Sequence, residues 1–147
     1  LSKGLSAPVG AIICGSRAFI AEVHRARKIL GGGMRQAGVL AAAGIVALDQ
    51  MVDRLAEDHV RARRLAAGFA EIPGLEVGPV HTNIFYFSLS ASCPLTGAEV
   101  ADGLKARGVL LPNRTARRFR AVTHCWIDDA AIDKALKAMR EVMADAG

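Results

Sequence analysis

The pattern of apolar and polar positions divides the first half of the chain into distinct segments. The run "PVGAIICG" at residues 8–15 is apolar, has the length of a strand and is bounded by proline and glycine, so a strand is predicted there. Ser16 can cap the next segment, and a helix is predicted over residues 16–30, ending at the glycines 31–33. From residue 36 the run "AGVLAAAGIVALDQMV" is apolar nearly all round, which is typical of a helix buried on most sides or at a subunit interface.

The second half of the chain mixes strands with amphipathic helices. Residues 53–72 are predicted to continue the apolar helix with one polar face, and Pro73 and Gly74 end it. Short strands are predicted in the segments 75–78, 82–89, 109–112 and 119–124.

Two capped helices complete the pattern. One is predicted over residues 96–108, with Thr96 as its cap and Gly108 at its end. The other is predicted over residues 128–145, capped by Asp128 or by the aspartate after it. The fold class that follows is α/β, in which a long central helix joins a helical, strand-bearing first part to a small α+β layer.

Composition supports a helical, globular chain and limits its partners. Of the 147 residues, 52% are hydrophobic and only 5% aromatic, which favours packed helices over an all-β sandwich. No apolar run reaches the roughly 18 residues of a membrane span, and no secretory signal is visible. Three widely spaced cysteines predict neither a disulfide framework nor a zinc site, so we expect reduced thiols and a cytoplasmic protein.

The net charge of +5 raises the question of a nucleic-acid partner. However, four arginines of the segment 53–64 alternate with acidic residues at helical spacing, which predicts a solvated, charge-laced helix face. No basic strand carries the aromatic residues on which bases stack. The sequence therefore favours a chain that binds neither nucleic acid nor membrane.

Lys3 is the first candidate for chemistry. It lies in "LSKGLSAPVG", among glycine, serine and small apolar residues, where a bulky cofactor could approach the amine. A lysine is nucleophilic only when its amine is deprotonated, which desolvation or a nearby cation favours. These surroundings suit a Schiff-base lysine, and a surface lysine in a loop is the alternative.

Arg35 and Arg120 are candidates for binding anions. Arg35 follows a glycine loop in "KILGGGMRQAG" and precedes the apolar helix, which is a favourable position for a phosphate or a carboxylate; an exposed arginine in a flexible loop is the alternative. In "RRFRAVTHCW", alternation places Arg120 on one face of a strand with Val122 and His124. A buried arginine at that position would bind a substrate carboxylate or form an internal salt bridge. His124 is interpreted as a core histidine.

These segments together resemble the L-threonine aldolases. "LSKGLSAPVG", "RKILGGGMRQAGVLAAAG", "TNI" and "FRAVTH" occur in the order and spacing of that family, from the cofactor lysine onward, and the resemblance covers essentially all of the chain. It implies the fold type I architecture of pyridoxal 5'-phosphate enzymes, with the C-terminal part of the large domain at residues 1–50, a connecting helix at 51–74 and a small α+β domain at 75–147.

The resemblance also implies roles for particular residues. Lys3 would hold pyridoxal 5'-phosphate covalently, Lys28 and Arg35 would lie close to its phosphate, reached from a neighbouring subunit, and Arg120 would bind the carboxylate of an amino-acid substrate. Such an enzyme cleaves L-threonine, L-allo-threonine and related β-hydroxy amino acids to glycine and an aldehyde, and forms a homo-oligomer, a dimer or a tetramer.

The sequence departs from the family in two ways and leaves two alternatives open. The phosphate-cradling loop, the stacking histidine and the aspartate that pairs with the pyridine nitrogen all lie upstream in complete members, so we expect the upstream half of the same enzyme as a partner. The segment "CWIDD" after "VTH" is longer than the acidic turn common in relatives. The alternatives are another fold type I reaction, such as β-elimination, and an inactive helical dimerisation module.

Overall fold

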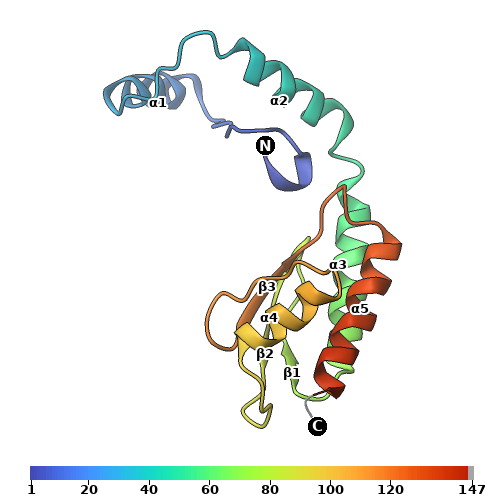
Figure 1. The fold of residues 1–147 in the computed structure, drawn as a ribbon. Helices are drawn as coiled ribbons and strands as arrows, with labels where there is room; N and C mark the ends of the chain where they lie inside the picture. The colour runs from blue at the N-terminus through green and yellow to red at the C-terminus, as the bar shows by residue number, and fades with distance from the viewer. Residues whose placement is uncertain (146–147) are drawn as a thin grey trace. The chain divides into compact units, whose positions relative to one another are not determined.

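The computed structural model describes residues 1–145 and forms two compact units, residues 1–53 and the chain from Arg54 onward (Figure 1). The first unit contains a short 3-10 helix, η1 (Lys3–Leu5), followed by α1 (Arg17–Ile29) and α2 (Gly38–Gln50). The predicted cap of α1 is confirmed, because the Ser16 hydroxyl accepts a hydrogen bond of 3.3 Å from the backbone N–H of Phe19. The sequence thus predicted a helix in each of the two segments that form α1 and α2.

The strand predicted at residues 8–15 is wrong. These residues have no regular secondary structure in the first unit, and all of them are exposed. A strand is stable only when its backbone groups pair with a neighbouring strand. Among the described residues, the one sheet is built from strands of the second unit, so this apolar segment has no ladder partner there.

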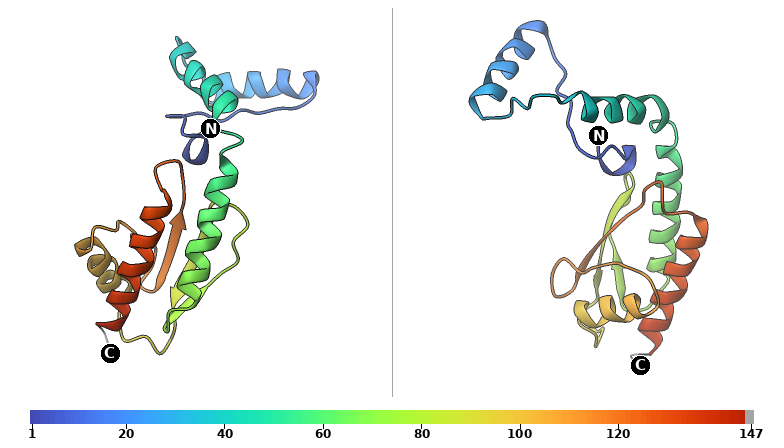
Figure 2. Two further views of the ribbon diagram at one scale, coloured as in Figure 1. Left: turned by 90° about the vertical axis from the view of Figure 1, so that its right-hand side faces the viewer. Right: turned by 45° about the horizontal axis from the view of Figure 1, so that its top comes forward.

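The second unit is a two-layer α+β structure. It contains α3 (Leu55–Ala70), β1 (Leu75–Val77), β2 (Ile84–Leu89), α4 (Gly97–Ala106), β3 (Arg118–Val122) and α5 (Asp129–Ala144). The three strands form an antiparallel sheet in the order β1-β2-β3. In this unit α3 and α5 lie side by side along one face of the sheet (Figure 1 and Figure 2).

The helix predicted to run unbroken through residues 36–72 is two helices. The chain turns at residues 51–54, between α2 and α3, and the boundary of the two compact units falls at the same place. As a result α3 is part of the second unit, where it packs on α5 and on the sheet. Its burial pattern follows the amphipathic sequence, with Ala62, Leu65 and Phe69 buried.

The core of the second unit lies between the helices and the sheet. Side chains from every strand point into it, and its largest fully buried members are Phe69, Phe85, Phe87, Phe119, Leu104, Ile132 and Met139. The rings of Phe87 and Phe119 stack with their centroids 4.8 Å apart, and Phe69 meets Phe87 edge-on at 5.0 Å. Aromatic pairs of this kind add to the gain from burial alone.

The predicted helix caps of the second unit are confirmed. Thr96 and Glu99 form a capping box at the start of α4, in which the Thr96 hydroxyl accepts from the Glu99 N–H and the Glu99 carboxylate accepts from the Thr96 N–H. The hydrogen bonds that the Glu99 carboxylate accepts from the Thr96 N–H and hydroxyl lower the pKa of Glu99. Gly108 follows α4 at φ +72°, and Asp128 caps α5 by accepting from the Ala131 N–H at 2.8 Å.

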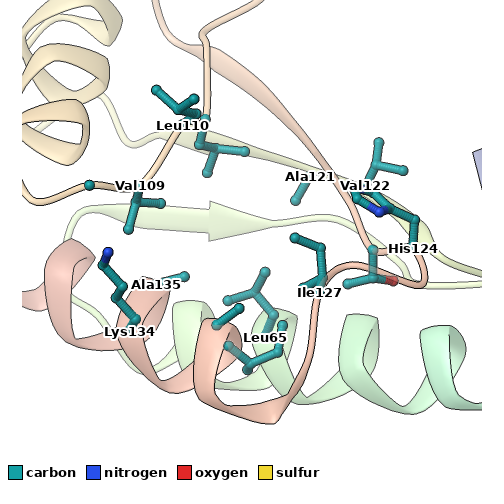
Figure 3. A pocket seen from close by; sticks show the side chains of 14 residues that line it. Leu65, Val109, Leu110, Ala121, Val122, His124, Ile127, Lys134 and Ala135 are labelled. Carbon is teal, nitrogen blue, oxygen red and sulfur yellow. The ribbon is translucent and has the colours of Figure 1, made fainter.

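The strand predicted at 109–112 is also wrong. The segment leads toward β3, but the ladder ends at a single bridge between Asn113 and Phe119. Pro112 precedes that bridge, and proline has no N–H to continue a ladder. An apolar cleft of about 430 Å³ remains between this segment, the end of β3 and α5 (Figure 3).

The charged face of α3 is only partly solvated, in contrast to the prediction. Asp58 is fully buried and pairs with Arg54, whereas Arg61 and Arg64 bridge α3 to the exposed carboxylates at the start of α5. None of the three cysteines forms a disulfide bond. Among the described residues, no helix has the length and apolar character needed to cross a membrane, and no cluster of side chains could hold a metal ion.

Candidate functional site

Lys3 lies in a turn whose backbone is unusual at two positions. Lys3 begins η1 with φ +62°, and Ser6 ends it with φ +60°, so two non-glycine residues adopt the left-handed region. The Ser6 N–H and hydroxyl both donate to the Lys3 carbonyl, at 2.8 and 3.3 Å, and close the turn. Left-handed non-glycine residues cluster at functional sites, because the surrounding structure must hold them in place.

The turn presents the lysine side chain rather than burying it. Lys3 is exposed, while Gly4 beside it is buried. Within the first unit, the Lys3 ammonium makes no hydrogen bond or ion pair. An amine held on a fixed backbone and left without a carboxylate partner is available to react with a carbonyl group.

Lys28 and the glycine loop come together in the same unit. Lys28 lies at the end of α1, and a Cβ added to Gly33 would come within 3.3 Å of its Cδ and 3.5 Å of its Nζ. The absence of a side chain at Gly33 thus lets Lys28 lie across the loop. Gly31 has φ +77°, which a glycine adopts without strain.

Arg35 follows this loop and precedes α2. It is exposed, its neighbour Gln36 has φ +49°, and its guanidinium makes no hydrogen bond or ion pair within residues 1–53. Lys28 and Arg35 therefore flank a glycine loop with two cationic groups that no carboxylate of this unit neutralises. Such a set of donors fits a phosphate group.

Arg120 lies on β3 of the second unit, on the predicted face of the strand. Phe119 and Ala121 are buried in the core, so Arg120 points to the opposite face of the sheet, which no helix of this unit covers. The side chain is half-buried, not buried as predicted. Within residues 54–145 its guanidinium makes no hydrogen bond, ion pair or ring contact, so the internal salt bridge is not observed and the arginine is free to bind an anion.

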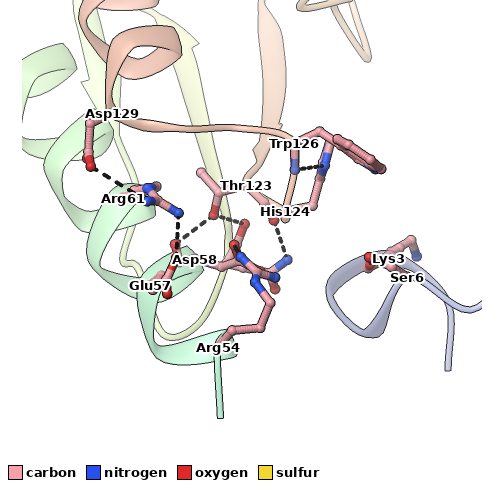
Figure 4. A network of polar contacts seen from close by, with 11 residues as sticks. Lys3, Ser6, Arg54, Glu57, Asp58, Arg61, Thr123, His124, Trp126 and Asp129 are labelled. Atoms are coloured by element: carbon pink, nitrogen blue, oxygen red, sulfur yellow. Dashed lines mark hydrogen bonds and ion pairs between the residues drawn. The ribbon is translucent and has the colours of Figure 1, made fainter. Parts of the chain in front are cut away.

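A buried polar network holds the end of this strand (Figure 4). The Thr123 hydroxyl donates to the Asp58 carbonyl at 2.7 Å. Asn83 and Thr123 also bond through their backbones and the amide: the Thr123 N–H donates to the Asn83 carbonyl at 2.9 Å, and the Asn83 side-chain amide donates to the Thr123 carbonyl at 2.8 Å. The "TNI" and "VTH" segments of the sequence are thus joined at one point.

Arg54 anchors this network to the start of α3. Its guanidinium donates to both carboxylate oxygens of Asp58, at 2.5 and 3.1 Å. The hydrogen bond to Asp58 raises the pKa of Arg54 above its ordinary value. The sequence alone indicated no role for these residues, although the motifs that carry Asn83 and Thr123 were a signal that they matter.

His124 is half-buried beyond the end of β3, and its Nδ1 accepts a hydrogen bond of 3.3 Å from the backbone N–H of Trp126. Trp126 is 83% exposed in the loop "CWIDD". Of the predicted site residues, Lys3, Lys28 and Arg35 lie in the first unit and Arg120 in the second.

Comparison with solved structures identifies the class of fold. A protein from Exiguobacterium sp. 255-15, described as an aromatic amino acid beta-eliminating lyase/threonine aldolase, matches 96% of the chain and 43% of its own length with a TM-score of 0.74 and 19% identity. A cysteine desulfurase from Escherichia coli matches 78% of the chain and 32% of its own length with a TM-score of 0.64 and 13% identity. The fold is the α/β fold of the fold type I enzymes, as predicted.

Comparison of sequences identifies the family. The model of the beta-eliminating lyase family matches residues 1–92, and the chain therefore belongs to that family. It is 39% identical to low-specificity L-threonine aldolase 1 of Arabidopsis thaliana over 145 residues, or 97% of the chain. It is 42% identical to the low specificity L-threonine aldolase of Escherichia coli K12 over 124 residues, or 84% of the chain.

The chain spans 40% of the length of the Arabidopsis relative and 35% of that of the Escherichia coli relative. The resemblance to the threonine aldolases that the sequence motifs indicated is confirmed by these relatives.

Proposed function

We propose that the protein to which this chain belongs cleaves β-hydroxy amino acids, such as L-threonine and L-allo-threonine, to glycine and an aldehyde with pyridoxal 5'-phosphate as its cofactor. The observation that carries the proposal is the Lys3 turn, which holds an exposed lysine at φ +62° inside the first of the family's motifs. The relatives named as threonine aldolases are 39 and 42% identical to the chain and support the choice of reaction.

The residues of the first unit fit the cofactor. The Lys3 amine would hold it covalently, and Lys28 and Arg35 would bind its phosphate beside the glycine loop, where Gly33 leaves room for Lys28. When bound, the cofactor supplies an electron sink for the bond that breaks at the substrate's Cα. A phosphate between two cations that have no other partner in this unit would fix the position of the cofactor.

Arg120 of the second unit would bind the substrate carboxylate. Its guanidinium lies on the uncovered face of the sheet and has no acidic partner within residues 54–145. A bidentate pair with a carboxylate restricts rotation of the substrate and so selects which bond at Cα is broken. The Thr123 and Asp58 contacts hold the end of the strand that carries Arg120.

Product analysis of the complete enzyme that contains this chain tests the reaction. With L-threonine, we expect glycine and acetaldehyde in equal amounts, and no products when Lys3 is replaced by alanine. The formation of a keto acid and ammonia instead would contradict the proposal.

A second candidate reaction is β-elimination, which the description of the matching family favours. It would use the same lysine and the same carboxylate-binding arginine, so the residues of this chain do not distinguish the two. The products do, because elimination releases a keto acid and ammonia, whereas aldol cleavage releases glycine. L-threonine, L-allo-threonine and phenylserine are suitable substrates for the comparison.

Assembly and location form a further part of the proposal. The apolar side chains that α2 exposes, among them Val39 and Ile45, would be covered by the upstream part of the same enzyme and by a second copy in a homo-oligomer, a dimer or a tetramer. Three cysteines that form no disulfide bond are consistent with a cytoplasmic enzyme. Light scattering of the complete enzyme measures the number of copies, and a monomeric enzyme would contradict the assembly proposal.

A further inference from the structure

Tyr86 and Arg120 are direct neighbours across the open face of the sheet. They form one register pair of β2 and β3, and both point away from the core. The hydrogen bonds from the Leu89 N–H to the Arg117 carbonyl and from the Thr123 N–H to the Asn83 carbonyl fix the alternation of the ladder. The Tyr86–Arg120 pair is therefore a non-hydrogen-bonded pair, in which opposite side chains lie closest.

The cation that occupies the Tyr86 ring is nevertheless Arg118. The Cζ of Arg118 lies over the ring, 4.6 Å from its centroid. In the register, Arg118 is opposite Ser88, so its side chain reaches diagonally across the sheet to the ring. The ring is 42% exposed, and an arginine over an aromatic face at this distance is held by a cation–π attraction.

Arg120 lies directly opposite Tyr86 in the register but forms no cation–π contact with its ring, or with any other ring, among residues 54–145. Two guanidinium groups repel each other, and the ring face taken by Arg118 is not open to a second cation. Arg118 and Arg120 follow each other at alternate positions of one strand, so they compete for the same aromatic neighbour.

We infer that Arg118 is a positioning residue: by occupying the Tyr86 ring, it keeps Arg120 unstacked and free to bind the substrate carboxylate. This inference rests on the proposed function, because it requires Arg120 to bind a carboxylate. It deepens that function by assigning roles to two residues that do not touch the substrate.

The consequence is a change in the fraction of enzyme molecules whose Arg120 is unstacked and able to bind substrate. Without Arg118, the Arg120 guanidinium stacks on the ring opposite, and only the unstacked fraction binds substrate. The apparent affinity falls by that fraction, while bound substrate reacts at the normal rate. A cation–π contact at an exposed site would raise the KM by about three- to fivefold and leave kcat unchanged.

The test is a double-mutant cycle in the complete enzyme, with KM and kcat measured for L-threonine. We expect Arg118→Met to raise the KM about three- to fivefold. Tyr86→Leu removes the ring, so it should leave the KM near the wild-type value, and in that background Arg118→Met should have no effect. This rescue by a second substitution would not follow from a purely structural role of Arg118.

Two control variants separate stacking from charge. Arg114→Met removes one exposed arginine of the neighbouring loop, which has no contact with Tyr86, and should leave the KM unchanged. Arg118→Lys keeps a cation that can lie on the ring and should remain close to wild type. A crystal structure of the Arg118→Met enzyme should show the Arg120 guanidinium within about 6 Å of the Tyr86 centroid.

The outcomes separate this inference from the proposed function. If Arg120→Ala raises the KM but Arg118→Met behaves like Arg114→Met, the inference is overturned and the carboxylate role of Arg120 stands. The inference is equally overturned if the Tyr86→Leu/Arg118→Met enzyme keeps the raised KM. If Arg120→Ala itself leaves the KM unchanged, the carboxylate role fails, and this inference fails with it.

Discussion

The two units of the chain differ in how they use their apolar side chains. In residues 1–53 the buried positions are limited to the small residues Gly4, Ala7, Gly44 and Ala47. Large apolar side chains are exposed there instead: Val9, Ile12, Ile13, Phe19, Ile29, Leu30, Met34, Val39, Ile45, Val46, Leu48 and Val52. The second unit buries four phenylalanines in one core.

The part of the chain that contains the stable core is therefore not the part that carries most of the candidate site residues. The second unit has a closed core and offers one face of its sheet, with Arg120 on it. The first unit carries Lys3 and Arg35 in turns and loops and Lys28 in the last turn of α1, but it has no large buried core to stabilise them. The lysine turn, with its left-handed backbone, would therefore depend on other parts of the enzyme for its rigidity.

The largest expected effect is on folding of the separated units. A fragment of residues 54–147 should unfold cooperatively, because its core is complete, whereas a fragment of residues 1–53 should show no cooperative transition. Circular dichroism during thermal unfolding measures both. A cooperative transition in the fragment of residues 1–53, or none in the fragment of residues 54–147, would contradict this difference between the two units.

Single side chains should reproduce the contrast on a smaller scale. Phe87→Ala should lower the free energy of unfolding of the second unit by about 3–5 kcal/mol, since Phe87 is 1% exposed and contacts three other rings. Phe19→Ala in the first unit, where the ring is 48% exposed, should change that free energy by less than about 0.5 kcal/mol. Urea denaturation gives both values, and equal losses would contradict the account.

The buried ion pair of α3 should have an intermediate effect. Asp58→Asn removes the carboxylate that binds Arg54 and should cost about 1.5–3 kcal/mol of stability. Glu57→Gln is the matched control, because Glu57 forms a more exposed pair with Arg61 on the same helix and should cost at most about 1 kcal/mol. Comparable costs would show that burial of Asp58 does not matter.

The smallest effect is a pH dependence at the start of α4. The folded protein lowers the pKa of Glu99, so the carboxylate stabilises the fold above its unfolded pKa, and this contribution is lost as the pH falls through the folded value. Urea denaturation between about pH 6 and pH 3 should therefore show a shallower loss of stability in Glu99→Gln than in the wild type. Parallel pH profiles would assign the loss to other carboxylates.

The sequence predicted the local features of this structure and missed the features that depend on distant partners. Ser16, Thr96 and Asp128 were recognised as caps because a cap and its helix are neighbours in sequence. The strands at 8–15 and 109–112 failed because a strand needs a partner, which an apolar run does not specify.

The candidate site shows the same division. The placement of Arg120 on the face of β3 opposite Phe119 and Ala121 followed from alternation alone. Burial of Asp58 could not be predicted, because an aspartate on an amphipathic helix is usually solvated, and only the contacts of Thr123 and Arg54 explain its place. Likewise, the stacking of Arg118 on Tyr86 depends on the register of two strands.

The most direct test of the central claim is reductive trapping of the cofactor in the complete enzyme. Borohydride treatment of the enzyme loaded with pyridoxal 5'-phosphate, followed by peptide mass mapping, should place a pyridoxyl group on Lys3 and leave Lys28 unmodified. A pyridoxyl group on Lys28 or on another lysine, or no modification of the Lys3 peptide, would contradict the assignment of Lys3 as the cofactor-binding residue.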